Sequence, residues 1–380
     1  MTVKAKTMLP MVDLKGQYRK IKSEIDASIQ ECLDSAAFIN GAHVKSFQKN
    51  LEFYLNVKHV IPCANGTDAL QIAMMALALQ VDDEVIVPAF TYVATAEVIA
   101  LLKLKPIMVD VDPKTFNITA EIIEKAITPR TKAIVPVHLF GQSCDMEAIM
   151  AVAEKHNLYV IEDNAQAIGA DYNFSNGQKA KTGTIGHIGC TSFFPSKNLG
   201  CYGDGGAIMT NDDDLAAKLR MMANHGQSRQ YYHDSIGVNS RLDSIQAGIL
   251  DVKLRHLDEY SAARQQAAAY YDAAFAQIEG LETPARQHNS THVFHQYTLK
   301  VKNGQRAALR TYLTEGGVSA MIYYPMPLYK QTAYAHYWQG GELPVTEELC
   351  DEVMSLPIHT EMTEETLAYI TETVKSFFDK

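Results

Sequence analysis

Between residues 59 and 210, short apolar runs alternate with segments of helical length, and this alternation constrains the fold more than any other feature of the chain. The runs are rich in β-branched residues and almost continuously apolar, as in HVIPCAN, EVIVPAF, PIMVDVD, AIVPVHLFG, LYVIED, CTSFFPS and GAIMTND. Strands of this kind are buried on both faces, because the connecting helices cover a mainly parallel sheet. The pattern therefore predicts a large doubly wound α/β domain around a mostly parallel seven-stranded sheet.

The rest of the chain predicts a second, smaller domain. The segment RHLDEYSAARQQAAAYYDAAFAQI contains no proline or glycine and is typical of one long helix. HQYTLKV beyond it is typical of a strand and YYPMPL of a loop, which indicates a small α+β domain. We place the large domain, with a helix over IKSEIDASIQECLDS, at residues 1–250 and the small domain at residues 251–380.

Charge and cysteine spacing exclude several classes of protein. The chain has 34 Lys and Arg against 44 Asp and Glu, a net charge of −10 that opposes broad binding to nucleic acid or to an anionic membrane. No stretch has the uncharged length of a transmembrane helix, and no signal core opens the chain. The six cysteines and thirteen histidines form no C-x-x-C or H-E-x-x-H motif, so we expect a cytoplasmic protein with reduced thiols and no metal.

Ligands of such a sheet collect beyond the carboxyl ends of its strands, so the residues that follow each apolar run are candidates for the chemistry. Asn65, Gly66 and Thr67 end one run and open an apolar helix. A helix N-terminus presents unpaired N–H groups and a partial positive charge, which suits a phosphate. Neither a dinucleotide fingerprint nor a P-loop is present, so a monophosphate fits better. A helix cap without a ligand remains the alternative.

Two further strand ends carry ionisable groups. Asp163 ends the run LYVIED, where a buried carboxylate needs a cationic partner such as a protonated pyridine nitrogen, and Gln166 would lie beside that ring. Lys197 follows CTSFFPS and precedes several glycines, which indicates a shaped loop. A lysine amine can form a Schiff base with an aldehyde cofactor. Taken alone, Asp163 could instead form a turn, and Lys197 could instead be an ordinary surface lysine.

Taken together, the motifs resemble those of the nucleotide-sugar aminotransferases of the DegT/DnrJ/EryC1 group, within the fold-type I enzymes that use pyridoxal phosphate. The resemblance extends from PMVDLKGQY to YYPMPL and so covers most of the chain. Its motifs stand in the order of that family: ANGTDAL, PAFTYVATAE, VDVDP, PVHLFGQ, EDNAQAIGA, SFFPSKNLGCYGDGGA, NHGQ and GVNSRLDSIQA. The order and number of these motifs make the resemblance far more specific than any one of them.

The resemblance implies a role for each matching residue. Lys197 would be the Schiff-base lysine and general acid/base, and Asp163 would pair with the pyridine nitrogen. Gln166 would contact the ring hydroxyl, and Phe90 would pack over the face of the ring. The phosphate would be held by Gly66, Thr67 and Ser192, together with Asn239 of a neighbouring subunit. The active unit is then expected to be a homodimer.

The resemblance also points to residues that contact the substrate or the amino donor. Arg241 could hold a carboxylate with its guanidinium group, and an interface salt bridge is its alternative. Tyr323 and Tyr324 could contact the sugar, or could simply pack before the two prolines that follow. His225 could transfer a proton or order its loop.

The expected reaction is the transfer of an amine from glutamate to a nucleotide-linked keto sugar. A related branch carries histidine in place of the lysine and removes a hydroxyl, so Lys197 favours transamination over a sugar dehydratase. The motifs most resemble enzymes that act on UDP-2-acetamido-3-keto-glucuronate for surface polysaccharide, although that subgroup has histidine where this chain has Tyr323. A dTDP-3-keto-6-deoxyhexose, a 4-keto sugar and a non-catalytic nucleotide-sugar sensor are the alternatives.

Overall fold

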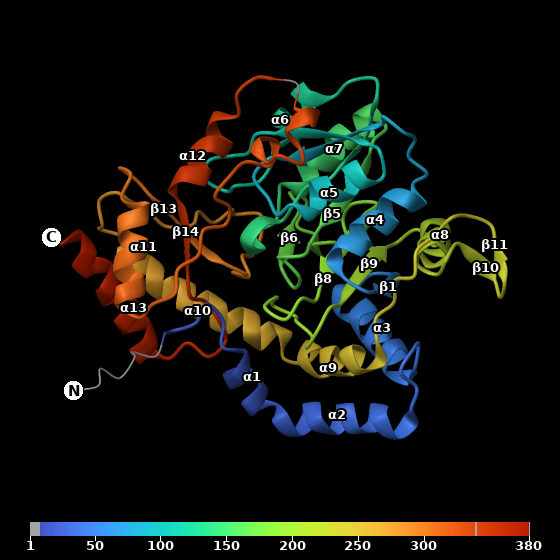
Figure 1. Cartoon of the computed structure of the whole chain (residues 1–380), viewed down its shortest axis with the longest axis horizontal. Coiled ribbons are helices and arrows are strands. Elements are labelled where there is room, and N and C mark those ends of the chain that lie inside the picture. The colour runs from blue at the N-terminus through green and yellow to red at the C-terminus, as the bar shows by residue number, and fades with distance from the viewer. Residues whose placement is uncertain (1–7, 339, 380) are drawn as a thin grey trace.

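A seven-stranded sheet forms the centre of the computed structural model, which describes residues 8–338 and 340–379. Its strand order is β1-β9-β8-β5-β4-β2-β3, and Figure 1 labels β1, β9, β8 and β5 of this sheet. Only β9 runs antiparallel to its neighbours, and the other strands of this sheet run parallel to one another. The predicted fold class is confirmed. The strands are β1 (His59–Cys63), β2 (Glu84–Pro88), β3 (Lys105–Val109), β4 (Thr131–Ile134), β5 (Tyr159–Asp163), β8 (Ile188–Ser192) and β9 (Gly206–Thr210).

Helices cover both faces of this sheet. Along β2, Val85 and Val87 pack into the core beneath one set of helices, while Ile86 packs into the core on the opposite face. Because successive side chains of a strand point to opposite faces, both faces must be covered to bury such a run. One face carries α4 (Gly66–Ala76), α5 (Ala94–Leu101) and α8 (Asp213–Ala223). The other carries α3 (Ala42–Leu55), α6 (Ala120–Ala126), α7 (Met146–His156) and α9 (Ser244–Leu254).

Two of the predicted strands end earlier than their apolar runs. In AIVPVHLFG the strand β4 stops at Ile134, two residues before Pro136, and in CTSFFPS the strand β8 stops at Ser192, before Pro195. Pro136 has no N–H group to donate to a neighbouring strand, which explains why β4 is short. The residues that follow β8 form the loop that carries Lys197.

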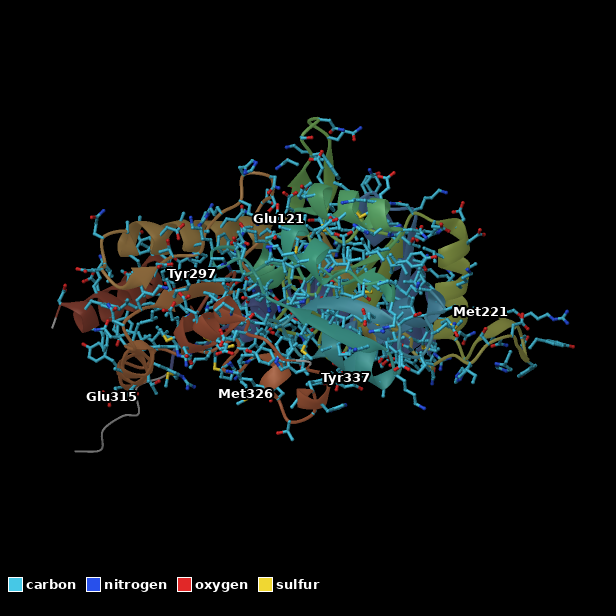
Figure 2. All side chains as sticks on the ribbon, turned by 90° about the horizontal axis from the view of Figure 1, so that it is seen from above. Glu121, Met221, Tyr297, Glu315, Met326 and Tyr337 are labelled. Atoms are coloured by element: carbon cyan, nitrogen blue, oxygen red, sulfur yellow. The ribbon has the colours of Figure 1, made fainter. Side chains whose placement is uncertain are left out.

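A smaller three-stranded antiparallel sheet follows in the chain, in the order β12-β13-β14. The predicted long helix is α10 (Leu257–Phe275), and the predicted strand is β13 (Tyr297–Val301). In Figure 2, Tyr297 lies among the packed side chains of this unit, at the opposite end of the molecule from Met221 of α8. The remaining elements of this unit are β12 (Leu281–Glu282), β14 (Val353–Leu356), α11 (Arg306–Glu315), α12 (Pro344–Glu352) and α13 (Glu364–Phe378).

We propose that the boundary between the two units, expected near residue 250, lies at the junction of α9 and α10. The helix α9 packs on α2 (Lys22–Ser35) and α3, whereas α10 packs on α13 and contributes Tyr271 to the core of the small sheet. The later chain does not stay within the small unit, because Leu328 and Leu349 pack into the two cores of the large sheet. This return brings the loop before Leu328 over the carboxyl ends of the large sheet.

Short elements complete the fold. The helix α1 (Leu14–Lys20) precedes α2, and two hairpins, β6 (Asp171–Asn173) with β7 (Lys179–Lys181) and β10 (Gln227–Arg229) with β11 (Tyr232–His233), lie outside the sheets. The single-turn helices are η1 (Leu139–Gly141), η2 (Leu328–Lys330) and η3 (Ala335–Tyr337). All six cysteines are buried and free. Within residues 8–338 and 340–379, no helix combines the length and the apolar character needed to cross a membrane.

Candidate active site

A cavity of about 970 Å³ lies at the carboxyl ends of β1, β2, β5 and β8. The chain returning from the small unit forms its opposite wall with Tyr323, Tyr324 and Met326. Several of the residues that follow the apolar runs in the sequence line this one cavity: Asn65, Gly66, Thr67, Thr91, Asp163, Ser192 and Lys197. Strand ends that are far apart in the sequence therefore meet at one place, as expected for a parallel sheet.

The N-terminus of α4 faces the cavity. Asn65 caps this helix, since its side-chain oxygen accepts a hydrogen bond of 2.8 Å from the backbone N–H of Asp68. A Cβ atom on Gly66 would lie 2.7 Å from the Cβ of Ser192, so only glycine allows the two segments to approach this closely. The cap does not exclude a ligand, because a helix start has four N–H groups without partners in the helix. This corner of the cavity can therefore hold an anion.

Lys197 and Asp163 lie in the same cavity. The Lys197 side chain reaches the cavity, and the surrounding protein displaces water and lowers the pKa of its amine to about 8, although the nearby Asp163 carboxylate opposes this shift. Asp163 is 6% exposed. Its carboxylate accepts hydrogen bonds from the Thr95 hydroxyl at 2.9 Å and from the Ala165 backbone N–H at 3.1 Å. The Asp163 carboxylate is thus fixed in the same cavity as an amine whose pKa is lowered.

A buried hydrogen-bond network anchors the strand that delivers Asp163. The neighbouring Glu162 is fully buried and accepts a 2.8 Å hydrogen bond from Nε2 of His138. Nδ1 of His138 accepts from the backbone N–H of Cys144 at 3.1 Å, so Nε2 is the nitrogen that carries the hydrogen. The same carboxylate also accepts from three backbone N–H groups in the loop before β8: Gly183, Ile185 and Gly186. His138 and Glu162 therefore support the site from behind without lining it.

Gln166 and Tyr324 form one wall of the cavity. The Gln166 amide accepts a hydrogen bond of 2.8 Å from the Phe140 backbone N–H and donates one of 3.2 Å to the Tyr324 hydroxyl. Burial raises the pKa of Tyr324, so its hydroxyl keeps its proton and can donate a hydrogen bond of its own. Tyr323 lines the same wall. Gln166 and Tyr324 therefore present fixed polar groups to any ligand of the cavity.

Phe90, expected over the face of a bound ring, lies outside the cavity lining. It is 1% exposed, and its ring packs edge-on against Phe140 and Tyr324 at centroid distances of 6.4 and 6.0 Å. Tyr92, two residues further on, lines the cavity, and its ring centroid lies 6.3 Å from that of Tyr324. The backbone turns after β2, so the aromatic that reaches the cavity is Tyr92 and not Phe90.

Besides Phe90, three of the expected site residues lie outside this cavity: Asn239, Arg241 and His225. Asn239 and His225 are exposed, and Asn239 pairs with Asn224 in an isolated antiparallel bridge. They follow α8 and flank the β10–β11 hairpin, which extends away from the sheet (Figure 1). A single copy of the chain does not bring them to Lys197, and a contribution to a site of a second copy stays a prediction.

The structure adds residues that sequence reasoning did not single out. Thr95 binds Asp163, and Tyr92 and His295 line the cavity. Thr95 and Tyr92 belong to the motif PAFTYVATAE, which offered a signal without saying which of its residues face the site. His295 comes from the small unit, and nothing in the pattern of strand ends indicates it.

The chain belongs to the DegT/DnrJ/EryC1/StrS aminotransferase family, whose family model matches residues 19–375. It is 49% identical to the UDP-2-acetamido-2-deoxy-3-oxo-D-glucuronate aminotransferase of Pseudomonas aeruginosa, over 93% of this chain and 95% of that relative. It is 45% identical to the UDP-N-acetyl-3-dehydro-alpha-D-glucosamine 3-aminotransferase of Acidithiobacillus ferrooxidans, over 97% of this chain and 98% of that one.

Solved structures agree with this assignment. A DegT/DnrJ/EryC1/StrS aminotransferase from Brucella abortus, 40% identical, superposes with a TM-score of 0.93 over 98% of this chain and all of that chain. NtdA of Bacillus subtilis with bound cofactor PMP, 31% identical, superposes with a TM-score of 0.91 over 100% of this chain and 87% of that chain. At the level of the family, the predictions of the fold, an aminotransferase, a nucleotide-sugar substrate and pyridoxal phosphate are confirmed.

Proposed function

We propose that this chain transfers an amine from glutamate to the 3-keto group of UDP-2-acetamido-3-keto-glucuronate, with pyridoxal phosphate held at Lys197. The product would serve the synthesis of bacterial surface polysaccharide. The observation that carries the proposal is one cavity that contains the Lys197 amine, the Asp163 carboxylate and the N-terminus of α4. The names of the two relatives, each of which specifies a UDP-linked 3-keto sugar, support the choice of nucleotide and of the carbon that is aminated.

The residues present fit the cofactor. The corner formed by Gly66, Thr67 and Ser192 has a helix N-terminus and no Cβ in the way, which suits a phosphate. The Asp163 carboxylate would hold a ring nitrogen in its protonated form. We assign the ring face to Tyr92 in place of Phe90, because of these two neighbouring aromatics only Tyr92 lines the cavity.

Pyridoxal phosphate supplies an aldehyde to which amines add and a ring that withdraws electrons. The chain supplies the groups that bind and that move protons. With its pKa near 8, Lys197 is partly neutral at physiological pH, so its Nζ can add to a carbonyl carbon and can take up and return a proton. Gln166 and Tyr324 would orient the ring hydroxyl and the sugar beside that amine.

We also propose that a second copy of the chain completes the site. Lys197 is the single lysine or arginine among the described residues that line the cavity, while three aspartates line it: Asp68, Asp163 and Asp204. The diphosphate of the substrate and the carboxylates of glutamate need further cations. Arg241 could supply one of these cations, and Asn239 could supply a phosphate contact, each from the neighbouring copy.

We further propose that the protein acts in the cytoplasm. The free, buried state of all six cysteines supports this compartment, since free thiols persist where the surroundings are reducing.

The test offers the purified protein, loaded with pyridoxal phosphate, glutamate and a panel of UDP- and dTDP-linked keto sugars. Mass spectrometry identifies the sugar that gains an amine, and glutamate consumption is measured in parallel. We expect the 3-keto-glucuronate to react fastest, with one glutamate consumed per product. Preference for UDP-N-acetyl-3-dehydroglucosamine, whose sugar carries no carboxylate, would replace the proposed substrate. A deoxygenated product without glutamate consumption would indicate a dehydratase, and a chain that binds sugars but takes up no cofactor would indicate a sensor.

Mixing variants tests the shared site. Lys197→Ala and Asn239→Ala each damage every site of their own homodimer, but a mixed dimer contains one site with both native residues. If half of the dimers are mixed, activity should return to about a quarter of the wild-type level. Mixtures that stay as inactive as their components would show that each copy builds its site alone.

A further inference from the structure

One ionisable residue of the cavity, His295, has no part in the function proposed above. It lies just before β13, is 7% exposed and lines the cavity together with Lys197. Its Nδ1 atom is buried and has no hydrogen-bond partner within residues 8–338 and 340–379. Leaving a buried polar atom unpaired is unfavourable, so such an atom in a residue that lines a binding cavity points to a partner that arrives or changes during function.

The segment that carries His295 is tied to the loop that carries Lys197. Asn198, the residue after Lys197, donates a hydrogen bond of 2.8 Å from its side chain to the backbone carbonyl of Val293. The buried Arg264 of α10 donates hydrogen bonds from Nη1 to the backbone carbonyls of Phe294 at 3.0 Å and of His295 at 3.5 Å. The backbone segment that carries the His295 imidazole is therefore joined by the Asn198 hydrogen bond to the loop that carries the Lys197 amine.

The charges around His295 favour its neutral form. Burial and the positive charges of Lys197 and Arg264 hold the pKa of His295 well below its ordinary value. The other titratable groups that line the cavity are three carboxylates and three phenols: Asp68, Asp163, Asp204, Tyr92, Tyr323 and Tyr324. A neutral imidazole keeps one unprotonated nitrogen that can accept a hydrogen bond. Two nearby cations make acceptance from a donor the favourable use of that nitrogen.

We propose that His295 is a positioning residue for Lys197: when the amine is free of the cofactor, the lysine side chain turns from the position seen here, in which no hydrogen bond joins the two residues, and its protonated Nζ donates to the unprotonated ring nitrogen of His295. The imidazole takes up no proton in this contact. It holds the ammonium against the wall of the cavity, and the amine becomes neutral when the proton passes to water. The inference rests on the proposed function only in taking Lys197 as the reacting amine.

The experiment measures the protonation of Lys197 in protein freed of cofactor. Trinitrobenzenesulfonate labels neutral amines, and mass spectrometry of the Lys197 peptide gives the labelling rate as a function of pH. We expect a midpoint below the ordinary value for lysine in the wild type, because the amine is buried. His295→Phe keeps an aromatic ring but removes the acceptor, so the midpoint should fall by about one unit, with about tenfold faster labelling at pH values well below the midpoint. His295→Asn keeps an acceptor and should stay within about half a unit.

His292→Phe is the matched control, because His292 is also buried in this segment but does not line the cavity of Lys197. It should leave the midpoint unchanged. Thermal unfolding shows which variants fold, and His295→Met replaces His295→Phe if the latter does not. A folded variant without an acceptor but with the wild-type midpoint would overturn the proposal, as would His295→Asn shifting as far as His295→Phe. Cofactor absorbance of the same proteins separates this outcome from a failure of the proposed function, in which even the wild type binds no pyridoxal phosphate.

Discussion

Two lysines of this chain have a pKa lowered to about 8 by burial, and they lie in very different surroundings. Lys253, on α9, is 1% exposed, and its amine donates a hydrogen bond of 2.7 Å to the Gly200 carbonyl. It also lies 4.3 Å from the centre of the Tyr202 ring. Lys197 instead lines a cavity that it shares with a fixed carboxylate.

The comparison teaches that a lowered lysine pKa does not by itself mark a reactive amine. Burial lowers both pKa values for the same reason, since removing water disfavours the charged form. What differs is access to a ligand and the groups that share the space with the amine. Lys253 has an internal partner in the loop that follows Lys197, so one lysine supports the backbone that presents the other.

The largest expected effect separates the two lysines directly. Replacing Lys197 with alanine removes the amine that we propose holds the cofactor, so turnover should fall at least about a thousandfold and the visible absorbance of the bound cofactor should be lost. Lys253→Met should keep that absorbance. Steady-state kinetics and an absorbance spectrum after reconstitution measure both effects. A Lys197→Ala protein that still turns over at the wild-type rate would place the reactive amine elsewhere.

The next largest effect is expected from Asp163, the carboxylate that lines the same cavity as Lys197. Asp163→Asn keeps the size of the side chain but removes the charge that would hold a ring nitrogen protonated, so we expect the single-turnover rate with glutamate to fall about a hundredfold or more. Asp68→Asn is the matched control, because it removes a carboxylate from the same cavity. Equal losses in the two variants would mean that only the net charge of the cavity matters.

A smaller loss of activity is expected at Thr95, which holds Asp163 in place. Thr95 is fully buried on α5 and donates its hydroxyl hydrogen to Asp163 at 2.9 Å. Thr95→Val keeps the shape and removes this bond, which is worth about 1.5–3 kcal/mol when the acceptor is charged, so kcat/KM should fall at least about tenfold. Thr95→Ser, which retains a hydroxyl, should recover most of the loss. Indistinguishable valine and serine variants would show that packing alone matters at this position.

Most of the large sheet could be predicted because its strands are buried on both faces and leave long apolar runs such as LYVIED. The absence of proline and glycine likewise predicted α10. The reversed direction of β9 could not be predicted, since a buried strand has the same pattern in either direction. The return of residues 328–353 to the large unit could not be predicted either, because it depends on packing between segments remote in the sequence.

The site was predictable where it lies at strand ends and not elsewhere. Asp163 and Lys197 follow apolar runs, and a parallel sheet must bring such positions together. Choosing between Phe90 and Tyr92 requires the course of the backbone after β2, which the sequence does not show. His295 enters from another part of the chain, and the positions of Asn239 and Arg241 would need a second copy.

Replacing Lys253 is expected to have the smallest effect on activity. Its main effect should be on stability. Its amine has a pKa of about 8 in the folded protein against 10.5 for an ordinary lysine, so between these values the unfolded chain binds more protons. The free energy of unfolding should therefore rise with pH across this window through Lys253, and Lys253→Met should lose about 1–2 kcal/mol of that rise while turnover changes less than about threefold. Urea unfolding at pH 7.5 and pH 9.5 measures the difference, with the exposed Lys49→Met as control. If the wild type and Lys253→Met show the same pH dependence, the Lys253 amine remains charged in the folded protein, and Lys197 becomes the only lysine of the pair whose surroundings favour the neutral form.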